Sequence, residues 1–496
     1  RSRQSRRFTR SHRPLGKSFS ERHLQPHSKH IAEPNGADPM SSPAWAPRKR
    51  RNTELAMLIV AIALAVGARI SVELAVNETV PASVYTFAVL FSAVALAAHF
   101  AVRFLLPYAD PILLPLVVTL NGIGITMIHR IDLARQAKNA TAGSLATSQM
   151  TWTVVGITGF IIVMAVVRDH RILQKYTYTF GFIAIALLLM PLLPVVGQEI
   201  RGARLWIHIG PFSFQPGEAA KISLAIFFAG YLVVKRDALA LAGKRFAGID
   251  WPRGRDLGPI VMAWLLSLGI LVFQRDLGSS LLFFGLFVVV LYVATERPGW
   301  IFVGTGLFVV GAWFGYLNFS HVQRRVSAWL DPWANPDQNF QIINALYGMA
   351  HGGVLGRGWG EGRPTLTPFS FSDFILTSIG EELGLTGLMA VIMIYVLIVE
   401  RGIRIALTCR DAFGKLLAIG LTASMAFQVF VVTGGVTHLI PLTGLTTPFL
   451  AHGGSSIVMN WAIIALLLII SHQTRRPAPE VLDFSADEET QVVKLK

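Results

Sequence analysis

Apolar runs of about 20 residues recur from residue 55 to residue 472, and polar segments separate them. An α-helix needs about 20 apolar residues to cross the hydrocarbon core of a bilayer. The pattern therefore predicts an all-α polytopic membrane protein with about twelve transmembrane helices. The predicted spans lie near residues 55–76, 82–106, 111–129, 151–167, 177–197, 218–234, 257–273, 279–295, 299–317, 374–398, 413–434 and 455–472.

Four segments lack this apolar pattern. Residues 1–53 are rich in Arg, Ser, Pro and His, and we predict a disordered basic tail there. Residues 473–496 are short and mixed in charge, and they predict a second tail. The segments 235–256 and 318–373 are long polar connections, of which the second predicts a large loop outside the membrane. Met40 is a plausible start, so the sequence leaves open whether residues 1–39 are native.

Composition supports a membrane protein, because 53% of residues are hydrophobic and only 15% are charged. Soluble domains carry about 25% charged residues, so a soluble enzyme and a disordered scaffold are both excluded. Of 44 Lys and Arg, residues 1–51 hold 13, against 3 Asp and Glu. We expect this tail to bind anionic lipid rather than nucleic acid. The single Cys409 excludes an intramolecular disulfide framework and a cysteine-based metal site.

Lys and Arg are denser in one set of loops than in the other. With the N-terminus inside, the inner loops carry residues such as Arg401, Arg404 and Arg475, whereas the longer outer loops carry fewer, among them Arg130 and Arg135. Cytoplasmic loops carry such an excess. We therefore predict that both termini are cytoplasmic and that loop 318–373 is extracytoplasmic.

Polar residues cluster first around the start of the predicted span 218–234. Arg204 and Trp206 come before it, and Glu218 and Lys221 lie in its first turn. Side chains three residues apart share one face of a helix, so Glu218 and Lys221 can pair. The pair is either a structural ion pair or the wall of a site that faces the outer leaflet.

Asp276 follows a predicted span and precedes Gly278, which suits a tight turn. The carboxylate could pair with Arg275 or with a neighbouring loop. A structural role and a role in a site both remain open for it.

The long loop carries Arg324, Arg325 and Gln341, then a run of glycines that includes Gly358, and ends at Asp373. The glycines let the backbone turn tightly and approach a ligand closely, but no Gly-Lys-Ser/Thr follows, so they are not a P-loop. Asp373 lies where the loop re-enters the membrane. It could be a general base with a raised pKa or the N-cap of the next helix.

Near the end of the chain, Pro441, Gly444 and Pro448 predict broken backbone inside the membrane, which is tolerated only where it is buried in protein or lines a cavity. His452 could carry a proton or be a structural histidine. Glu381 and Glu382 lie inside the span 374–398, so at least one must face the protein interior, and we interpret them as structural.

Taken together, these motifs resemble the SEDS family of RodA, FtsW and SpoVE. The matching residues are Gly202-Ala203-Arg204-x-Trp206, Gln215-Pro216-x-Glu218-x-x-Lys221, Gln274-x-Asp276-Leu277-Gly278, Ser372-Asp373-Phe374-Ile375, Ile379-Gly380-Glu381-Glu382-Leu383-Gly384, Pro441-x-Thr443-Gly444, Pro448 and Gly453-Gly454-Ser455-Ser456. The resemblance covers about residues 110–472. Family members have about ten spans, so residues 54–109 form an extra N-terminal pair.

Several positions depart from the family pattern. Arg275 replaces a usual Pro, Gly217 a usual Ser, and Ala451-His452 a usual Ser-Tyr. Thr443 stands where FtsW often carries Lys, which favours the RodA branch and a role in elongation and cell shape. An FtsW-like division paralogue is the alternative within the family.

The resemblance implies a peptidoglycan glycosyltransferase that polymerises lipid II at the outer face of the bacterial cytoplasmic membrane. Asp373 matches the essential carboxylate of the family and would be the general base of an inverting reaction. The remaining candidates are substrate-binding residues (Arg204, Trp206, Arg324, Arg325, Gln341, Gly358 and Arg363) and supporting residues (Glu218, Lys221, Asp276, Thr443 and Ser455).

A divalent cation, Mg²⁺ or Mn²⁺, or the arginines would neutralise the pyrophosphate leaving group, and no dedicated metal site is visible in the sequence. The family also implies a class B penicillin-binding protein as transpeptidase partner. A lipid II flippase is the rival function, but it needs ionisable residues across the depth of the membrane, whereas these polar clusters gather on the outer side. A non-catalytic scaffold with Asp373 as a helix cap is the third possibility.

Overall fold

The computed structural model of the protein describes residues 49–477, apart from residues 195, 201–202, 210–211, 241–243, 247–248 and 252–253. Of the two predicted tails, 1–53 and 473–496, residues 1–48 and 478–496 lie outside the described residues, as does Gly202 of the first motif. The first helix begins at Arg51, inside the segment predicted as a tail.

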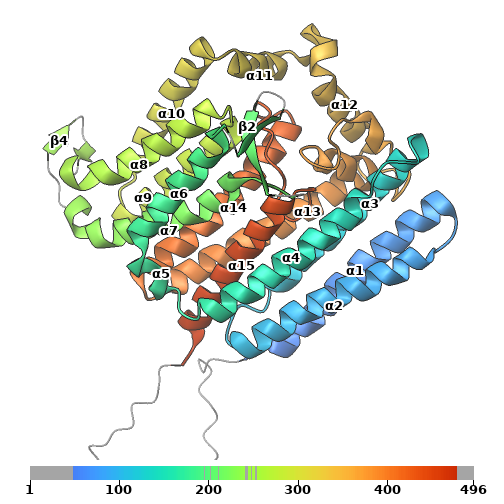
Figure 1. Cartoon of the computed structure of the whole chain (residues 1–496), viewed down its shortest axis with the longest axis horizontal. Helices are drawn as coiled ribbons and strands as arrows, with labels where there is room; N and C mark the ends of the chain where they lie inside the picture. The colour runs from blue at the N-terminus through green and yellow to red at the C-terminus, as the bar shows by residue number, and fades with distance from the viewer. Residues whose placement is uncertain are drawn as a thin grey trace, which may run out of the picture. The chain divides into compact units, whose positions relative to one another are not determined.

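Each of the twelve predicted spans corresponds to a helix. These helices are α1 (Arg51–Asn77), α2 (Ala82–Leu105), α3 (Leu113–Lys138), α4 (Leu145–Val166), α6 (Thr177–Leu189), α7 (Pro216–Ala240), α8 (Gly254–Phe273), α9 (Leu277–Thr295), α10 (Gly299–Asn318), α13 (Ile375–Thr408), α14 (Ala412–Val436) and α15 (Gly454–Arg475) (Figure 1). In the described part of the chain, ten are long and apolar enough to cross a membrane, whereas the apolar stretches Thr177–Leu192 and Gly258–Phe273 are shorter. The polytopic helical fold is confirmed, but the count of twelve spans is not.

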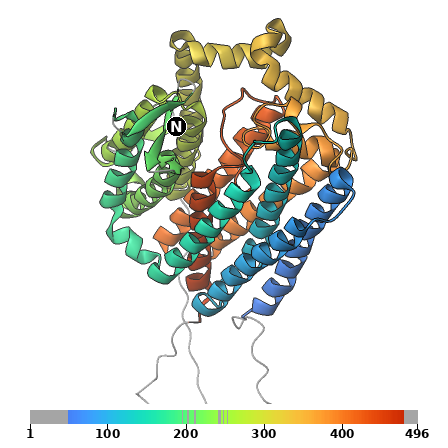
Figure 2. The ribbon, with the colours of Figure 1, turned by 45° about the vertical axis from the view of Figure 1, so that its right-hand side comes forward.

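Shorter elements join these helices. They are α5 (Arg171–Lys175), η1 (Met190–Leu192), β1 (Gly197–Ile200), β2 (Ala203–Ile209), β3 (Phe212–Phe214), β4 (Lys244–Phe246), β5 (Ile249–Trp251), α11 (Ser320–Leu330), η2 (Pro332–Ala334), α12 (Pro336–Gly352) and η3 (Pro364–Leu366). Strands β1, β2 and β3 form an antiparallel sheet in that order, and β4 pairs with β5. The predicted loop 318–373 is largely helical, and α11 crosses one end of the bundle from α10 to α12 (Figures 1 and 2).

The most buried helices are α3, α7 and α15, each with 78% of its most apolar stretch covered by protein, whereas α10 has 11%. The extra pair α1 and α2 lies beside α3 (Figure 1). Small residues bring α1 and α3 close, since a Cβ on Gly122 would stand 2.4 Å from Cβ of Ala65. Such small-residue contacts are typical of helices packed in membranes.

Buried polar contacts join α1 and α2 where α1 begins and α2 ends. Arg51 and His99 both contact Glu54, with a His99 Nδ1–Glu54 Oε1 distance of 2.7 Å, and Arg51 also donates to the Ala109 carbonyl. All three side chains are buried. Ionisable residues are therefore not confined to the side of the predicted site, contrary to the expectation drawn from the sequence.

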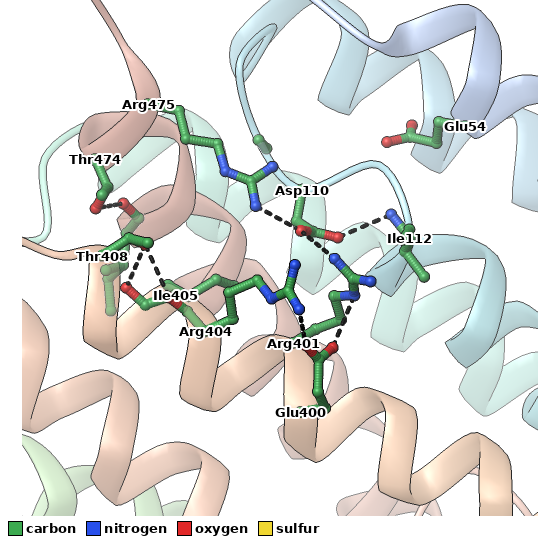
Figure 3. A network of polar contacts seen from close by, with 12 residues as sticks. Glu54, Asp110, Ile112, Glu400, Arg401, Arg404, Ile405, Thr408, Thr474 and Arg475 are labelled. Carbon is green, nitrogen blue, oxygen red and sulfur yellow. Dashed lines mark hydrogen bonds and ion pairs between the residues drawn. The ribbon is translucent and has the colours of Figure 1, made fainter. Parts of the chain in front are cut away.

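A charged network around Asp110 joins the two ends of the described chain (Figure 3). Arg475 donates to Asp110 Oδ2 at 2.7 Å, and Arg401 of α13 approaches the same oxygen at 4.0 Å. Glu400 accepts ion pairs from Arg401 at 3.0 Å and from Arg404 at 2.7 Å. Because Arg51 also reaches Ala109, both described ends lie on one side of the bundle, at the opposite end of α13 from Asp373.

Helix α13 is interrupted at Gly384, where φ is 68° and ψ is −170°. The loop that follows α12 packs into this break: Leu385 N donates to Gly353 O at 2.9 Å, and Thr386 N to Val354 O at 3.1 Å. A Cβ on Gly384 would stand 2.2 Å from Gly356 N, so only glycine fits. The glycine-rich segment is thereby fixed to the helix that Asp373 precedes.

Candidate active site

Asp373 lies just before α13, but it does not cap that helix. The N-cap position is Phe374, and no side chain accepts a capping hydrogen bond there. Oδ1 of the half-buried Asp373 instead accepts a hydrogen bond from Ser372 Oγ at 2.8 Å. The geometry therefore does not support the interpretation of Asp373 as a helix cap.

Arg325 of α11 stands beside Asp373. Its Nη1 donates to the carbonyl oxygens of Leu442 at 3.0 Å and Thr443 at 2.7 Å. A Cβ on Gly444, where φ is 77°, would lie 3.8 Å from both Arg325 Nη2 and Asp373 Oδ2. The Arg325 guanidinium and the Asp373 carboxylate therefore lie together against the broken segment 441–444.

Burial lowers the pKa of the Arg325 guanidinium, while the charges of Asp276 and Asp373 oppose that shift. An arginine keeps its charge across the physiological range of pH. Arg325 therefore brings a fixed positive charge to the carboxylate of Asp373.

A pocket of about 180 Å³ lies next to this group. Arg324, Arg325 and Gln341 line it, together with Leu442 and His438. The structure therefore brings three of the predicted substrate-binding residues, from α11 and α12, to the segment that holds Thr443. Its mixture of cations, an amide and apolar carbons suits an anionic ligand that also carries hydroxyl groups.

Asp276 is the N-cap of α9. It accepts hydrogen bonds from Ser279 N at 2.9 Å and Ser279 Oγ at 2.6 Å. Burial raises the pKa of the Asp276 carboxyl, whereas the bonds from Ser279 and the charge of Arg325 act to lower it. Asp276 therefore caps α9, and the charge of Arg325 acts on its carboxylate. Its further role in the site stays a prediction.

Glu218 and Lys221 form the buried ion pair expected from their spacing, with Lys221 Nζ 2.7 Å from Glu218 Oε2. Lys221 also donates to Gln428 Oε1 at 2.8 Å, and Gln428 Nε2 donates to the Thr446 carbonyl at 2.9 Å. The pair therefore ties α7 to α14 and to the segment that follows Gly444. The sequence did not single out Gln428 or Thr446.

Ser455, at the start of α15, also links two helices. Its Oγ accepts a hydrogen bond from Gln215 N at 2.8 Å, which joins the approach to α7 to α15. His452 follows the same broken segment, and its backbone N donates to Phe371 O at 2.8 Å. Burial lowers the pKa of His452, which favours the neutral ring.

Arg204 and Trp206 lie on β2, in a sheet that the sequence did not predict. Arg204 Nε pairs with Glu199 Oε2 at 3.3 Å, and both side chains are about half exposed. Among the described residues, neither Arg204 nor Trp206 lines the pocket beside Asp373. Their assignment as substrate-binding residues stays a prediction.

Gly358 and Arg363 lie in the segment from Gly352 to Asp373, here called the glycine loop, which folds around Glu381 and Glu382. Gly358 N donates to Glu382 O at 2.9 Å, and Arg363 N donates to Glu381 Oε1 at 2.9 Å. Gly360 N also donates to Glu382 Oε2 at 3.0 Å, so both carboxylates face protein, where at least one was expected to. Neither Gly358 nor Arg363 lines the pocket that Arg325 lines. The direct binding of substrate by Gly358 and Arg363 stays a prediction.

The sequence did not single out the cation that pairs with Glu382. Arg130 Nε lies 2.9 Å from Glu382 Oε1, and Arg130 Nη2 donates to Gly360 O and Gly362 O, both at 2.7 Å. The apolar pattern ends the third predicted span at residue 129 and leaves Arg130 in a loop, whereas α3 continues to Lys138. A buried carboxylate in a membrane helix requires such a partner, and that was the available signal.

Among the described residues, no group of three or more His, Cys, Asp or Glu side chains is placed to hold a metal ion. The residues around Asp373 therefore do not fit a dedicated metal site. Arginine charge is what the site itself offers to a phosphate group.

Comparison with known proteins shows which family the chain matches. The family model for FtsW, RodA and SpoVE, described as "Cell cycle protein", matches residues 111–476. "Peptidoglycan glycosyltransferase RodA" of Mycobacterium tuberculosis H37Rv is 45% identical over 86% of this chain and 92% of its own length. "Probable peptidoglycan glycosyltransferase FtsW" of Geobacter metallireducens is 32% identical over 73% and 94%.

A solved structure is also similar. It is described as "Structural coordination of polymerization and crosslinking by a peptidoglycan synthase complex", and it matches with a TM-score of 0.58 at 26% identity, over 75% of this chain and 99% of the other. The higher identity to RodA than to FtsW agrees with the branch that Thr443 favours. The chain belongs to the FtsW, RodA and SpoVE family.

Proposed function

We propose that the protein is a peptidoglycan glycosyltransferase of the RodA type, which polymerises lipid II for cell wall elongation. The relatives named above support this activity. The observation that carries it in the structure is the group formed by Asp373, Arg325 and Gly444 beside a pocket lined by Arg324 and Gln341.

In the proposed reaction, the carboxylate of Asp373 takes the proton from the 4-hydroxyl of the acceptor sugar. The hydroxyl oxygen forms a bond to the anomeric carbon of the donor, and the bond from that carbon to the polyprenyl pyrophosphate breaks, with inversion. Base catalysis of this kind contributes about 10²–10⁴-fold. The leaving group departs as an anion, so no general acid is required of the kind that glycosidases use.

Arg325 has two roles in this scheme. Its positive charge faces the negative charge that develops on the departing pyrophosphate. Its bonds to Leu442 and Thr443 hold the broken segment next to Asp373. Arg324, exposed at the same pocket, can contact a second phosphate oxygen.

Mg²⁺ or Mn²⁺ would have to be held mostly by the phosphates of the substrate, since the described residues offer no cluster of ligands. In the proposed scheme, Asp373 takes the proton and the two arginines stabilise charge on the leaving group.

The proposed orientation places both termini in the cytoplasm and Asp373 on the outer face of the bacterial cytoplasmic membrane. It is supported by Arg401, Arg404 and Arg475, which gather at the end of the bundle where both described chain ends lie (Figure 3). An excess of Lys and Arg is typical of the cytoplasmic side.

The proposed partner is a class B penicillin-binding protein, a transpeptidase that would crosslink the new strands. The similar structure of a peptidoglycan synthase complex supports a partner of this class. We expect contact through the outer spans and residues 318–373. The isolated chain should then be weakly active, and near-full activity without a partner would refute this part.

One experiment separates the proposed enzyme from a flippase. The full chain, purified with its partner, is placed in vesicles that contain lipid II, and both polymer on a gel and lipid II translocation are measured. Polymer without translocation is expected. Translocation without polymer would contradict the proposal.

A further inference from the structure

A second pocket, of about 460 Å³, lies on the same side of the bundle as Asp373, between the ends of α1 and α3 and the glycine loop. Ala75 and Val76 of α1 form one wall, and Ala134 and Ala137 of α3 form another. Sites for small ligands have volumes of roughly 300–1,000 Å³. The family model begins at residue 111, so the wall from α1 is outside the region that the model matches.

The polar lining of this pocket is mainly basic. Arg130, Lys138 and Arg363 line it together with one carboxylate, Glu361. Arg130 is engaged by Glu382 and by loop carbonyls. The side chains of Lys138 and Arg363 are exposed and have no polar partner among the described residues. Two cations are therefore available to an anion.

We propose that this pocket binds the carboxylate end of the short peptide that lipid II carries, an inference that rests on the proposed function. That peptide ends in two D-alanine residues and a free carboxylate. Its methyl groups match the walls formed by Ala75, Val76, Ala134 and Ala137, and its carboxylate matches Arg363 and Lys138.

The position of Arg363 connects this pocket to the chemistry. The glycine loop runs from Gly352 to Asp373, and Arg363 N is held by Glu381, inside the helix that Asp373 precedes. A peptide bound at Arg363 would therefore orient the sugar that bears it relative to Asp373. Arg363 and Lys138 are positioning residues in this scheme, because they touch the substrate away from the reacting atoms.

The test compares lipid II with lipid II whose terminal carboxylate has been amidated, using the full chain purified with its partner. In the wild type, amidation should raise KM three- to tenfold and change kcat little. Lys138→Gln/Arg363→Gln should show the higher KM with both substrates. Arg357→Gln is the matched control: it removes an exposed cation from the same loop, outside either pocket, and should retain the wild-type discrimination.

Equal KM values for the two substrates in the wild type, or discrimination that survives in the double variant, would overturn the assignment. Binding of the soluble peptide to the purified chain is measured separately. Peptide binding that the double variant loses, without polymer from the wild type, would uphold the pocket and refute the proposed function. Binding of glycerol phosphate without binding of the peptide would overturn the assignment in favour of a lipid headgroup.

Discussion

At the residue scale, Arg325 connects the separate parts of the candidate site. It comes from α11, donates to two carbonyls of the segment before Gly444, and stands beside Asp373. A single side chain thus fixes both the charge and the geometry of the site, and its substitution should affect the rate more than the fold.

Arg325→Gln should lower kcat about 10²-fold, because it removes the charge that faces the leaving group. Arg325→Lys keeps the charge but cannot reproduce the two fixed donations, so an intermediate rate is expected. Steady-state polymerisation of lipid II measures both. A Gln variant with the wild-type rate would exclude Arg325 from catalysis.

Arg275 provides a second prediction at this scale. Its φ is 61°, a left-handed conformation that proline cannot adopt, and its N donates to Val272 O at 3.0 Å. The family pattern with Pro at this position therefore cannot be transferred to this backbone unchanged. Arg275→Pro should lower the free energy of unfolding by more than about 1 kcal/mol.

A denaturing-detergent titration measures the stability of this variant, and Arg275→Ala is the control that removes the side chain while it keeps the N–H. If Arg275→Pro is as stable as the Ala variant, the left-handed conformation is wrong.

At the scale of elements, the buried pair Glu218–Lys221 joins α7 to α14 through Gln428. Lys221→Met would leave Glu218 buried without its cation and should cost about 3–5 kcal/mol of stability. Glu218→Gln/Lys221→Met removes both charges and should recover most of that loss.

The same double variant decides between the two roles left open for the pair. A variant that is stable and active indicates a structural pair. One that is stable but inactive indicates a wall of the site, and one as unstable as Lys221→Met would contradict the pairing itself.

The helices were predictable because an apolar segment long enough to cross the bilayer satisfies its own backbone hydrogen bonds there as a helix. The strands β1–β3 were not, since such short segments carry little pattern. The end of α3 was not predicted either. Arg130 and Asp132 can be buried in this helix because Glu382 pairs with Arg130 and Ala146 N donates to Asp132. A hydropathy pattern does not contain such contacts between separate segments.

The candidate site residues were also predicted only in part. Motif spacing predicted Asp373, and the structure places Arg325 beside that carboxylate and bonded to Thr443 O. Arg324 and Gln341 line the adjoining pocket with Arg325. The structure separates Arg204 and Arg363 from them. Order along the chain does not give the spatial arrangement of residues that different helices carry.

At the scale of the whole described chain, both ends and the Asp110 network (Figure 3) lie on one side of the helices. Asp373 lies on the other side, because it precedes the end of α13 opposite to Arg401. The extra pair α1 and α2 extends the bundle beside α3 and contributes a wall to the second pocket. The proposed reaction therefore has its base, its cations and its second pocket on one face.

The most direct test of the central claim is polymerisation of lipid II by the partnered full chain with Asp373 replaced by Asn. Asn can still accept the bond from Ser372 but cannot take a proton, so we expect a loss of at least about 10²-fold in rate with folding intact. Polymer formation at the wild-type rate by Asp373→Asn would contradict the assignment of Asp373 as the general base.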